Sequence, residues 1–486
     1  MTARQAAPRR MAWAHQVPRA TWLAFWLAFL AYAAIVAYAF ITLPWEGSAD
    51  AVFHIDYAYH VAHGEFPDPH SIDFAYGLTF NPDHHFTAAH PPLYYVASAP
   101  AAGTFIDADR WELAVVVMRG ISAVCGAVTF ATIAWFGWQF GGRYRDTLAV
   151  ALPAVSTLSV PFVRFSAEAY NDVPVTMFAA LAITVAAHIV RDGPRRGRMI
   201  SLAAIAVLGV ATKATFIIVL GVVLAGVVAA VIIHGHGSMW RRLRRGVLLA
   251  SPVLAAPILA MGWFYWWNYQ RSGSPVRAFP KFEHLGREYL DLGELLTNAD
   301  FYGLFFARAL GNNDWGWPPT NFAVSLAVSI VSALAAVVAL ALHRPWRGER
   351  FRVSAVIGAM VAAVLLGVYV AQGYQAIGYG TLNFRYLLPA SIAFGFMWGW
   401  GWLALGRRWS IAIPVQMLIL GAGTVFYTMW YLETRLPHKV RGASFLDLVH
   451  QGAVANDLPA ALPWALLGVF AAACASLAWA LPRTYR

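Results

Sequence analysis

The sequence predicts an all-α polytopic membrane protein with about 12 transmembrane helices, and three observations lead to this prediction. Of the 486 residues, 59% are hydrophobic and only 12% are charged. Several apolar runs reach the roughly 20 residues that a helix needs to cross the hydrocarbon core of a bilayer. Because lipid cannot satisfy free backbone N–H and C=O groups, each of these runs is expected to be helical.

Basic residues set the expected orientation of these helices. The formal net charge is +11, and the arginines gather in short loops between apolar runs. Those loops carry Arg9/Arg10, Arg143/Arg145, Arg191 to Arg198, Arg241 to Arg245, Arg344 to Arg352, Arg407/Arg408 and Arg483/Arg486. Alternate loops carry few basic residues, which is the positive-inside pattern of membrane proteins. The charge therefore indicates topology, and no nucleic-acid partner is expected.

Placing the arginine loops in the cytoplasm gives a consistent set of spans with both termini inside. The predicted spans are 20–43, 113–140, 147–163, 173–190, 199–212, 214–234, 246–268, 321–342, 353–371, 389–406, 410–431 and 461–481. Two short spans meet at Lys213; one long tilted helix is the alternative there, and it would reverse every later loop. The first run is too long for a signal-peptide core and is expected to remain as a helix.

Cysteine usage excludes two kinds of site. Cys125 and Cys474 are the only cysteines, and both lie inside apolar runs. Neither a disulfide framework nor a structural zinc spacing is available.

The extracytoplasmic side is predicted to hold most of the acidic residues. A long first loop, 44–112, is expected to contain interfacial helices, since loops of this length are usually functional. Its acids include Glu46, Asp50, Asp56, Glu65, Asp68, Asp73 and Asp83. A second large loop is expected at 269–320, and two short ones read "RFSAEAYND" (164–172) and "GYGTLNFRYLLP" (378–389).

The stretch "SADAVFHIDYAYHVAHGEFPD" in the first loop has a helical pattern with two polar faces. One face carries Asp50, His54 and Tyr57, and the opposite face carries Asp56, His60 and His63. Gly64 and Pro67 are expected to end the helix. Spacing alone leaves open which aspartate is buried.

A carboxylate at the edge of a low-dielectric region has a raised pKa and can accept a proton near neutral pH. A histidine one turn away can tune it, bind phosphate or share a divalent metal with it. The alternative is an amphipathic helix in the headgroup region with solvated charges.

Two further segments carry candidate binding residues. "HPPLYY" (90–95) is a rigid turn that would hold His90 in a fixed direction, although its tyrosines also suit an interfacial aromatic belt. "RFSAEAYND" places Arg164, Glu168, Asn171 and Asp172 at a helix mouth, where they could mark either the interface or a site.

Three cations lie within or beside apolar spans: Arg119, Lys213 and Arg385. Burying a cation at the bilayer centre costs at least ~2.5 kcal/mol, so each should pair with an anion or reach the surface. Together they could clamp a lipid phosphate, which arginine does through paired hydrogen bonds.

Assembled in order, these motifs resemble those of GT-C-type membrane glycosyltransferases, close to the protein-mannosyltransferase and aminoarabinose-transferase branch. The family's acid, Tyr or His, Gly and Pro after the first helix match Asp50, His54, Gly64 and Pro67. Its "PPL" with a following aromatic matches 91–94. The matches that follow are Arg119, Asn171–Asp172, Lys213 in "ATKAT", "NYQRSGSP" and Arg385 in "FRYLLPA". The resemblance runs from about Thr21 to Ala390.

This resemblance implies an enzyme that moves a sugar from a polyprenyl-phosphate donor to a glycan, lipid or protein acceptor on the extracytoplasmic face of a bacterial plasma membrane. Inverting transfer with Asp50 as general base is the expected mechanism. The expected catalytic residues are Asp50, Asp56 and Asp172. The expected substrate-binding residues are His54, His90, Tyr94, Glu168, Asn171, Lys213, Arg385 and Arg119. A divalent metal is compatible with this mechanism but is not required by it.

The chain departs from the family pattern at two positions. The usual Asp-Glu pair reads Asp50–Ala51, so a second acid must come from Asp56, Glu168 or Asp172. The residue before the tandem prolines is His90, where relatives often have Lys or Gln.

The expected organisation is a cytoplasmic tail (1–20), a GT-C-like transmembrane catalytic region (21–406) and C-terminal transmembrane helices (407–486). Two other classes of protein remain open at this point. A secondary transporter is the first, since about 12 spans with both ends inside is a common transporter plan. A non-catalytic scaffold for envelope assembly is the second.

Overall fold

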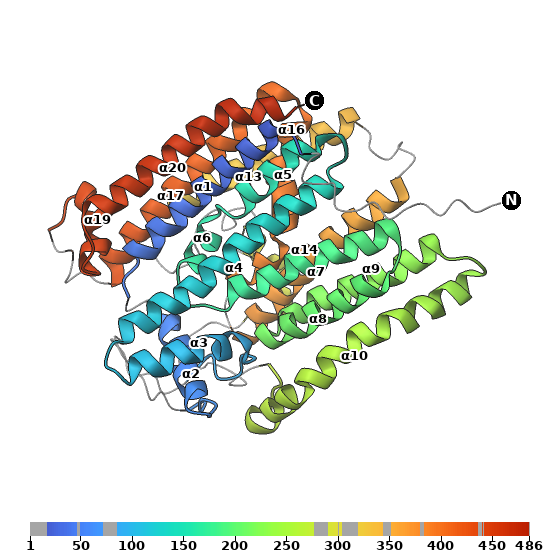
Figure 1. Cartoon of the computed structure of the whole chain (residues 1–486), viewed down its shortest axis with the longest axis horizontal. Helices are drawn as coiled ribbons and strands as arrows, with labels where there is room; N and C mark the ends of the chain where they lie inside the picture. Colours follow the sequence, from blue (N-terminus) through green and yellow to red (C-terminus); the bar gives the residue numbers. More distant parts are fainter. Residues whose placement is uncertain are drawn as a thin grey trace.

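The computed structural model shows the chain as a bundle of helices (Figure 1). The described residues are 17–45, 49–70, 85–276, 290–299, 301–303, 319–343, 351–379, 383–435, 440 and 442–485. Within these ranges every regular element is a helix, which confirms the predicted all-α class. Glu46, Asp73, Asp83 and much of the predicted loop 269–320 lie outside the described residues.

The α-helices follow one another along the chain. Their bounds are α1 Arg19–Thr42, α2 Ala49–Ala62, α3 Leu93–Ile106, α4 Trp111–Phe140, α5 Arg145–Ser156, α6 Val160–Ser166, α7 Asp172–Asp192, α8 Arg196–Thr212, α9 Phe216–His234, α10 Met239–Ser272, α11 Leu292–Thr297, α13 Pro319–His343, α14 Phe351–Tyr379, α15 Ser391–Gly395, α16 Gly401–Ala404, α17 Ala412–Arg435, α19 Phe445–Ala455 and α20 Ala461–Ala480. Shorter 3-10 segments are η1 Gly142–Tyr144, η4 Phe384–Ala390, η6 Arg407–Ile411 and η7 Leu481–Thr484, and η5 Phe396–Trp400 is a π-helical turn.

The described part of the chain contains nine helices long and apolar enough to cross a membrane, or up to ten if a bent pair counts as one span. The prediction was about 12 spans, and the difference has local causes. The predicted span 147–163 bends by 78° between α5 and α6. There Ser156 and Thr157 bond back to carbonyls of their own helix, and Pro161 opens the next helix. The helix α8 has only 17 residues, and the apolar part of α13 is limited to Leu326–Leu342.

Helices α7 to α10 run alternately up and down. Lys213, between α8 and α9, bonds to Asp172 at the start of α7. At the opposite end, His234 of α9 lies 2.9 Å from the carbonyl of Val190 near the end of α7. The chain therefore reverses direction at Lys213, as the prediction of two separate spans required, and does not continue as one long helix.

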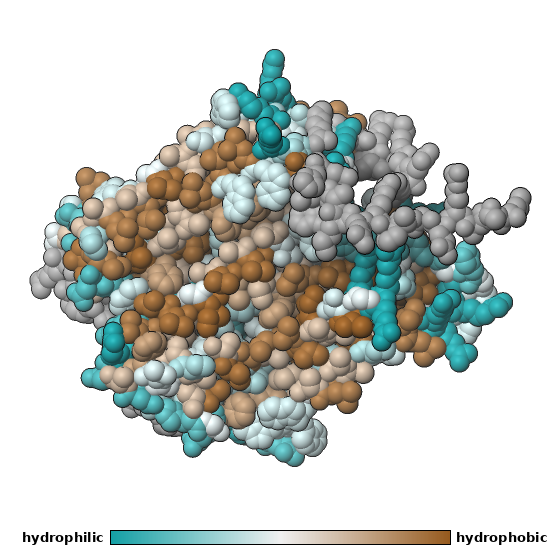
Figure 2. Space-filling model, in the orientation of Figure 1, coloured by the Kyte–Doolittle hydropathy of each residue, from teal (hydrophilic) through white to brown (hydrophobic). Residues whose placement is uncertain are grey.

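The two ends of the bundle differ in charge. The start of α7, the α8–α9 turn and the end of α10 lie at one end, together with α2 and α3 (Figure 1). The arginine-rich connections around 191–198 and 241–245 lie at the other end. Figure 2 shows apolar side chains over the middle of the visible face and hydrophilic ones toward its two ends. A helix bundle that spans a bilayer requires such an arrangement, with an apolar surface over its middle and polar surfaces at its two ends.

Candidate active site

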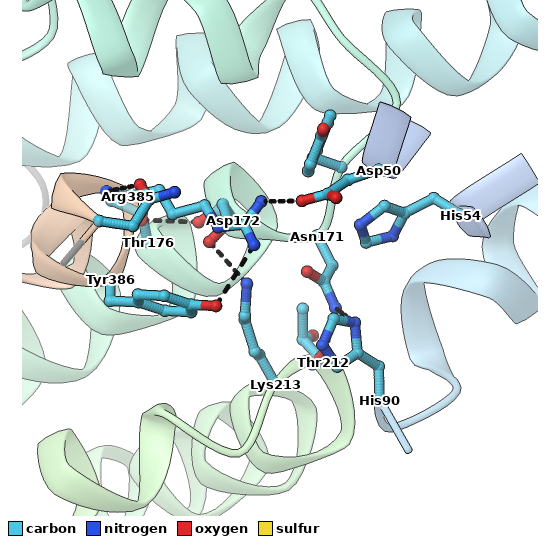
Figure 3. A network of polar contacts seen from close by, with 12 residues as sticks. Asp50, His54, His90, Asn171, Asp172, Thr176, Thr212, Lys213, Arg385 and Tyr386 are labelled. Atoms are coloured by element: carbon cyan, nitrogen blue, oxygen red, sulfur yellow. Dashed lines mark hydrogen bonds and ion pairs between the residues drawn. The ribbon is translucent and has the colours of Figure 1, made fainter. Parts of the chain in front are cut away.

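A polar cluster lies at the end of the bundle that carries α2 and α3 (Figure 3). Four separate segments supply its charged members. Asp50 comes from the first turn of α2, Asp172 from the start of α7, Lys213 from the turn between α8 and α9, and Arg385 from η4. The structure thus brings together four residues that the sequence analysis singled out, from positions up to 335 residues apart.

Two ion pairs form the centre of this cluster. Arg385 Nη1 donates to Asp50 Oδ2 at 2.7 Å, and Lys213 Nζ donates to Asp172 Oδ1 at 2.6 Å. The side chains of Lys213 and Asp172 are only 6% and 2% exposed, whereas that of Asp50 is 40% exposed. Asp50 is therefore the carboxylate that a molecule approaching from outside can reach.

Local structure explains why the two cations point into the cluster. Lys213 has an extended backbone (φ −160°, ψ 139°) that ends α8 and lets the chain reverse before α9. The backbone N–H of Arg385 is capped by the side chain of Asn383, and its Nη2 donates to the hydroxyl of Tyr386 at 3.3 Å. The ring of Tyr386 also lies 5.3 Å from Lys213 Nζ. A cation held by an aromatic face is stabilised by the ring quadrupole.

Buried His54 and half-buried His90 line the cluster and are linked through Tyr95. The Tyr95 hydroxyl lies 2.8 Å from His54 Nδ1 and 3.1 Å from His90 Nδ1. Asn171 Nδ2 lies 3.3 Å from His90 Nδ1 and donates to the carbonyl of Thr212 at 3.2 Å. Burial, and then the nearby charge of Lys213, hold the pKa of both histidines well below the ordinary value. Both rings are therefore neutral at pH 7.

Three buried polar atoms of the cluster make no hydrogen bond to any described residue: Asp172 Oδ2, Asn171 Oδ1 and Arg385 Nε. Buried polar atoms nearly always have a partner, protein or otherwise. Two acceptors and one charged donor suit a ligand that carries both hydroxyl groups and an anionic group.

Asp56, one of the predicted catalytic residues, lies outside this cluster. It is fully buried on the other face of α2, where its Oδ2 is 3.0 Å from His85 Nε2 and 3.5 Å from His60 Nε2. The two-faced pattern predicted for α2 is thus present. Spacing left open which aspartate is buried, and the structure shows that it is Asp56, whereas Asp50 is 40% exposed and faces Arg385.

Arg119 and Tyr94 were predicted to bind substrate, but both donate hydrogen bonds to backbone groups outside the cluster. Arg119 donates to the carbonyls of Phe40, Leu43 and Pro44. It therefore satisfies backbone acceptors at the end of α1, which a helix C-terminus leaves without partners. The hydroxyl of Tyr94 lies 3.3 Å from the carbonyl of Met118, so this side chain ties α3 to α4.

Glu168 pairs with Arg164 beside the cluster. Arg164 Nε lies 3.4 Å from Glu168 Oε1, and both side chains are buried. Tyr170 follows this pair in the sequence and reaches the cluster, since its ring lies 4.7 Å from that of His54 and 5.9 Å from the Arg385 guanidinium carbon.

Three aromatic members of the cluster were not predicted from the sequence: Tyr95, Tyr170 and Tyr386. Each directly adjoins a residue that was predicted to belong to the site. In "HPPLYY" the first tyrosine was chosen, although α3 begins at Leu93 and turns the second one toward the histidines. Among the described residues, no group of three or more His, Cys, Asp or Glu side chains is placed to hold a metal ion.

No family model and no curated protein sequence matches this chain. Solved structures similar to it include ArnT from Cupriavidus metallidurans bound to undecaprenyl phosphate and the same protein in the apo state. Each is 15% identical, with a TM-score of 0.49 over 94% of this chain. The matched region covers 75% of the first ArnT chain and 74% of the second.

Proposed function

We propose that this protein is a GT-C-type membrane glycosyltransferase that moves a sugar from a polyprenyl-phosphate donor to an acceptor at the extracytoplasmic face. The observation that carries the proposal is the meeting of the Asp50–Arg385 and Lys213–Asp172 ion pairs at one end of the bundle. The order of motifs along the chain supports the same class of donor. Asp50 would act as general base, and the two cations would hold the phosphate of the leaving group.

The proposed step is a single displacement. The acceptor hydroxyl gives its proton to Asp50, its oxygen bonds to the anomeric carbon, and the bond from that carbon to the phosphate oxygen breaks. The polyprenyl phosphate leaves with one more negative charge. Attack from the side opposite the leaving group inverts the anomeric centre.

Charge balance favours this assignment. With Asp50 and Asp172 ionised, the two carboxylates and two cations of the cluster sum to zero. Protonation of Asp50 leaves the cluster with a net positive charge when the leaving phosphate becomes more negative. A site with fixed charges that complement the transition state lowers the barrier without reorganising. Because the leaving group is a phosphate anion, no strong general acid is needed.

The position of the arginine loops supports an extracytoplasmic site. The 191–198 and 241–245 connections lie at the end of the bundle opposite the cluster. The positive-inside rule assigns the arginine-rich end to the cytoplasm. A secondary transporter would need ionisable groups near the midplane of its spans, whereas the two central ion pairs here involve helix ends and turns.

Incubating membranes that contain the protein with a panel of radiolabelled polyprenyl-phosphate sugars tests this function. Wild-type membranes should convert one donor and release polyprenyl phosphate. Asp50→Asn should lower the transfer rate by about 10²- to 10⁴-fold, the usual contribution of a general base. Asp107→Asn is the matched control, since Asp107 is an exposed carboxylate that contacts His63 away from the cluster.

Two outcomes would overturn the proposal. One is wild-type membranes that convert no donor of the panel although the protein is inserted. The other is an Asp50→Asn variant that keeps the wild-type rate, which would remove Asp50 as the base.

A further inference from the structure

The turn that carries His90 is held by side chains from two other helices. Three consecutive carbonyls, those of residues 88, 89 and 90, each accept one hydrogen bond. Arg271 Nη2 donates to Ala88 at 2.9 Å, Asn268 Nδ2 to Ala89 at 3.1 Å, and the Tyr57 hydroxyl to His90 at 2.9 Å.

The tandem prolines explain why the turn needs these partners. Pro92 has no N–H group, so the carbonyl of Ala88 cannot form the bond that a continuing helix would supply. Pro91 also keeps His90 out of the helical region. Buried carbonyls without partners cost free energy, so side chains must reach them from elsewhere.

Asn268 and Arg271 form a single unit at the end of α10. They are three residues apart on one helix face, and Asn268 Oδ1 accepts from Arg271 Nη2 at 3.2 Å. Asn268 is only 1% exposed. Arg271 Nη1 also donates to the carbonyl of Pro67, and its guanidinium lies 4.0 Å from the ring centre of Trp267. These contacts fix both side chains before they meet the turn.

We infer that Asn268 and Arg271 are positioning residues that aim His90 into the proposed donor-phosphate site. The identity of the ligand rests on the proposed function, whereas the contacts that hold the turn do not depend on it. The His90 ring keeps its contacts with Tyr95 and Asn171, at 3.1 and 3.3 Å, only if its backbone stays in place. Displacing a binding group by about 1 Å can cost up to 10²-fold in rate.

The other face of α10 places this unit at a defined depth. Trp263, Trp266 and Tyr269 are exposed on the same end of the helix. Tryptophan and tyrosine favour the boundary between hydrocarbon and headgroups. The unit that holds the His90 turn therefore lies at the level where the phosphate of a lipid carrier lies.

Hydrogen exchange in the full-length protein, reconstituted in nanodiscs, tests the positioning itself. Asn268→Ala and Arg271→Lys should each speed exchange of the amides of Ala88 and His90, which donate to His85 and Thr87. An increase of about 3- to 10-fold corresponds to the loss of one hydrogen bond. Gln270→Ala, an exposed neighbour on the same turn, should leave exchange unchanged. Unchanged exchange in both variants, or an equal increase throughout the molecule, would overturn the inference.

Binding of undecaprenyl phosphate by the same variants tests the consequence. Asn268→Ala should weaken binding about 10-fold. Adding Asn268→Ala to His90→Ala should weaken it no further, because both changes remove the His90 ring from the proposed donor-phosphate site. Additive losses would show that Asn268 does not act through His90. If the wild type binds neither this lipid nor a polyprenyl phosphate of another chain length, the proposed function fails while the exchange experiment still decides the positioning.

Discussion

At the scale of single residues, the Lys213–Asp172 pair is the part of the cluster most costly to disturb. Both side chains are buried, so removing one partner leaves an uncompensated charge. Asp172→Asn should lower the free energy of unfolding by about 3–5 kcal/mol. The measurement is the apparent melting temperature of the detergent-solubilised protein.

The double variant Asp172→Asn/Lys213→Met serves as the control for that prediction. It removes both charges, so much of the lost stability should return. A double variant that is less stable than either single variant would show that the ion pair is not the cause.

The two histidines of the cluster make stability depend on pH in a defined direction. The pKa values of His54 and His90 are lowered by burial and by Lys213, whereas the unfolded chain keeps values near 6.5. Below about pH 6.5 the unfolded state therefore binds protons that the folded state does not, and stability falls as the pH decreases further. Above that pH these two histidines add no slope.

A comparison of melting temperatures at pH 5 and pH 7.5 checks this sign. His54→Asn should reduce the drop at pH 5, because one proton-binding difference is gone while the amide can still face Tyr95. His236→Asn, at an exposed histidine, should keep the wild-type drop. A His54→Asn variant with an undiminished drop would contradict the assignment.

Residue types predicted the charged members of the cluster better than their neighbours. Asp50 and Asp172 stood out through the spacing and clustering of polar residues in their motifs. Lys213 and Arg385 stood out because a cation beside an apolar span is costly and needs a partner. The same reasoning selected Arg119, which donates hydrogen bonds to backbone carbonyls. A cation that binds backbone and one that binds a carboxylate look alike in sequence, because only the fold decides which acceptor lies nearby.

At the scale of elements, the packing of α19 against the end of α1 is unusually close. A Cβ at Gly452 would lie 1.8 Å from the carbonyl oxygen of Thr42. In the same region Asn456 donates to the carbonyls of Ile41 and Leu43. These contacts, with those of Arg119, fix the end of α1 just before the chain leads to α2 and Asp50.

Gly452→Ala should therefore destabilise the protein, because the clash is with backbone that cannot move aside. Overpacking usually costs about 1–3 kcal/mol, and this substitution should fall at the upper end. Gly468→Ala in α20 is the matched control, since nothing lies within 4 Å of its Cβ and alanine favours the helix. Thermal unfolding of both variants measures the difference, and equal melting temperatures would refute the close packing.

Element boundaries show where sequence patterns stop being informative. Apolar length predicted α1, α4 and α9 well, because their lipid-facing surfaces need long apolar runs. It did not show that α5 and α6 are bent by 78°, because both are almost entirely buried and the bend depends on neighbouring helices. By contrast, the turn at Lys213 was predicted, although no helix-breaking residue marks it. The prediction came from the arginine-rich loops on either side.

At the scale of the whole molecule, the alternating direction of α7 to α10 links the site to the topology. The cluster and the 191–198 connection lie at opposite ends of these helices. If the arginine loops are cytoplasmic, the cluster must face the other side of the membrane. Orientation in the membrane is therefore a direct test of where the chemistry takes place.

Single cysteines placed at the two ends make this test. In a background with Cys125 and Cys474 replaced by alanine, His63→Cys lies at the exposed end of α2, and Arg196→Cys lies at the exposed start of α8. A membrane-impermeant maleimide added to intact cells should label His63→Cys at once and Arg196→Cys only after permeabilisation. The opposite labelling would place Asp50 in the cytoplasm. An extracytoplasmic acceptor would then be out of reach, although the charge complementarity of the cluster would still stand.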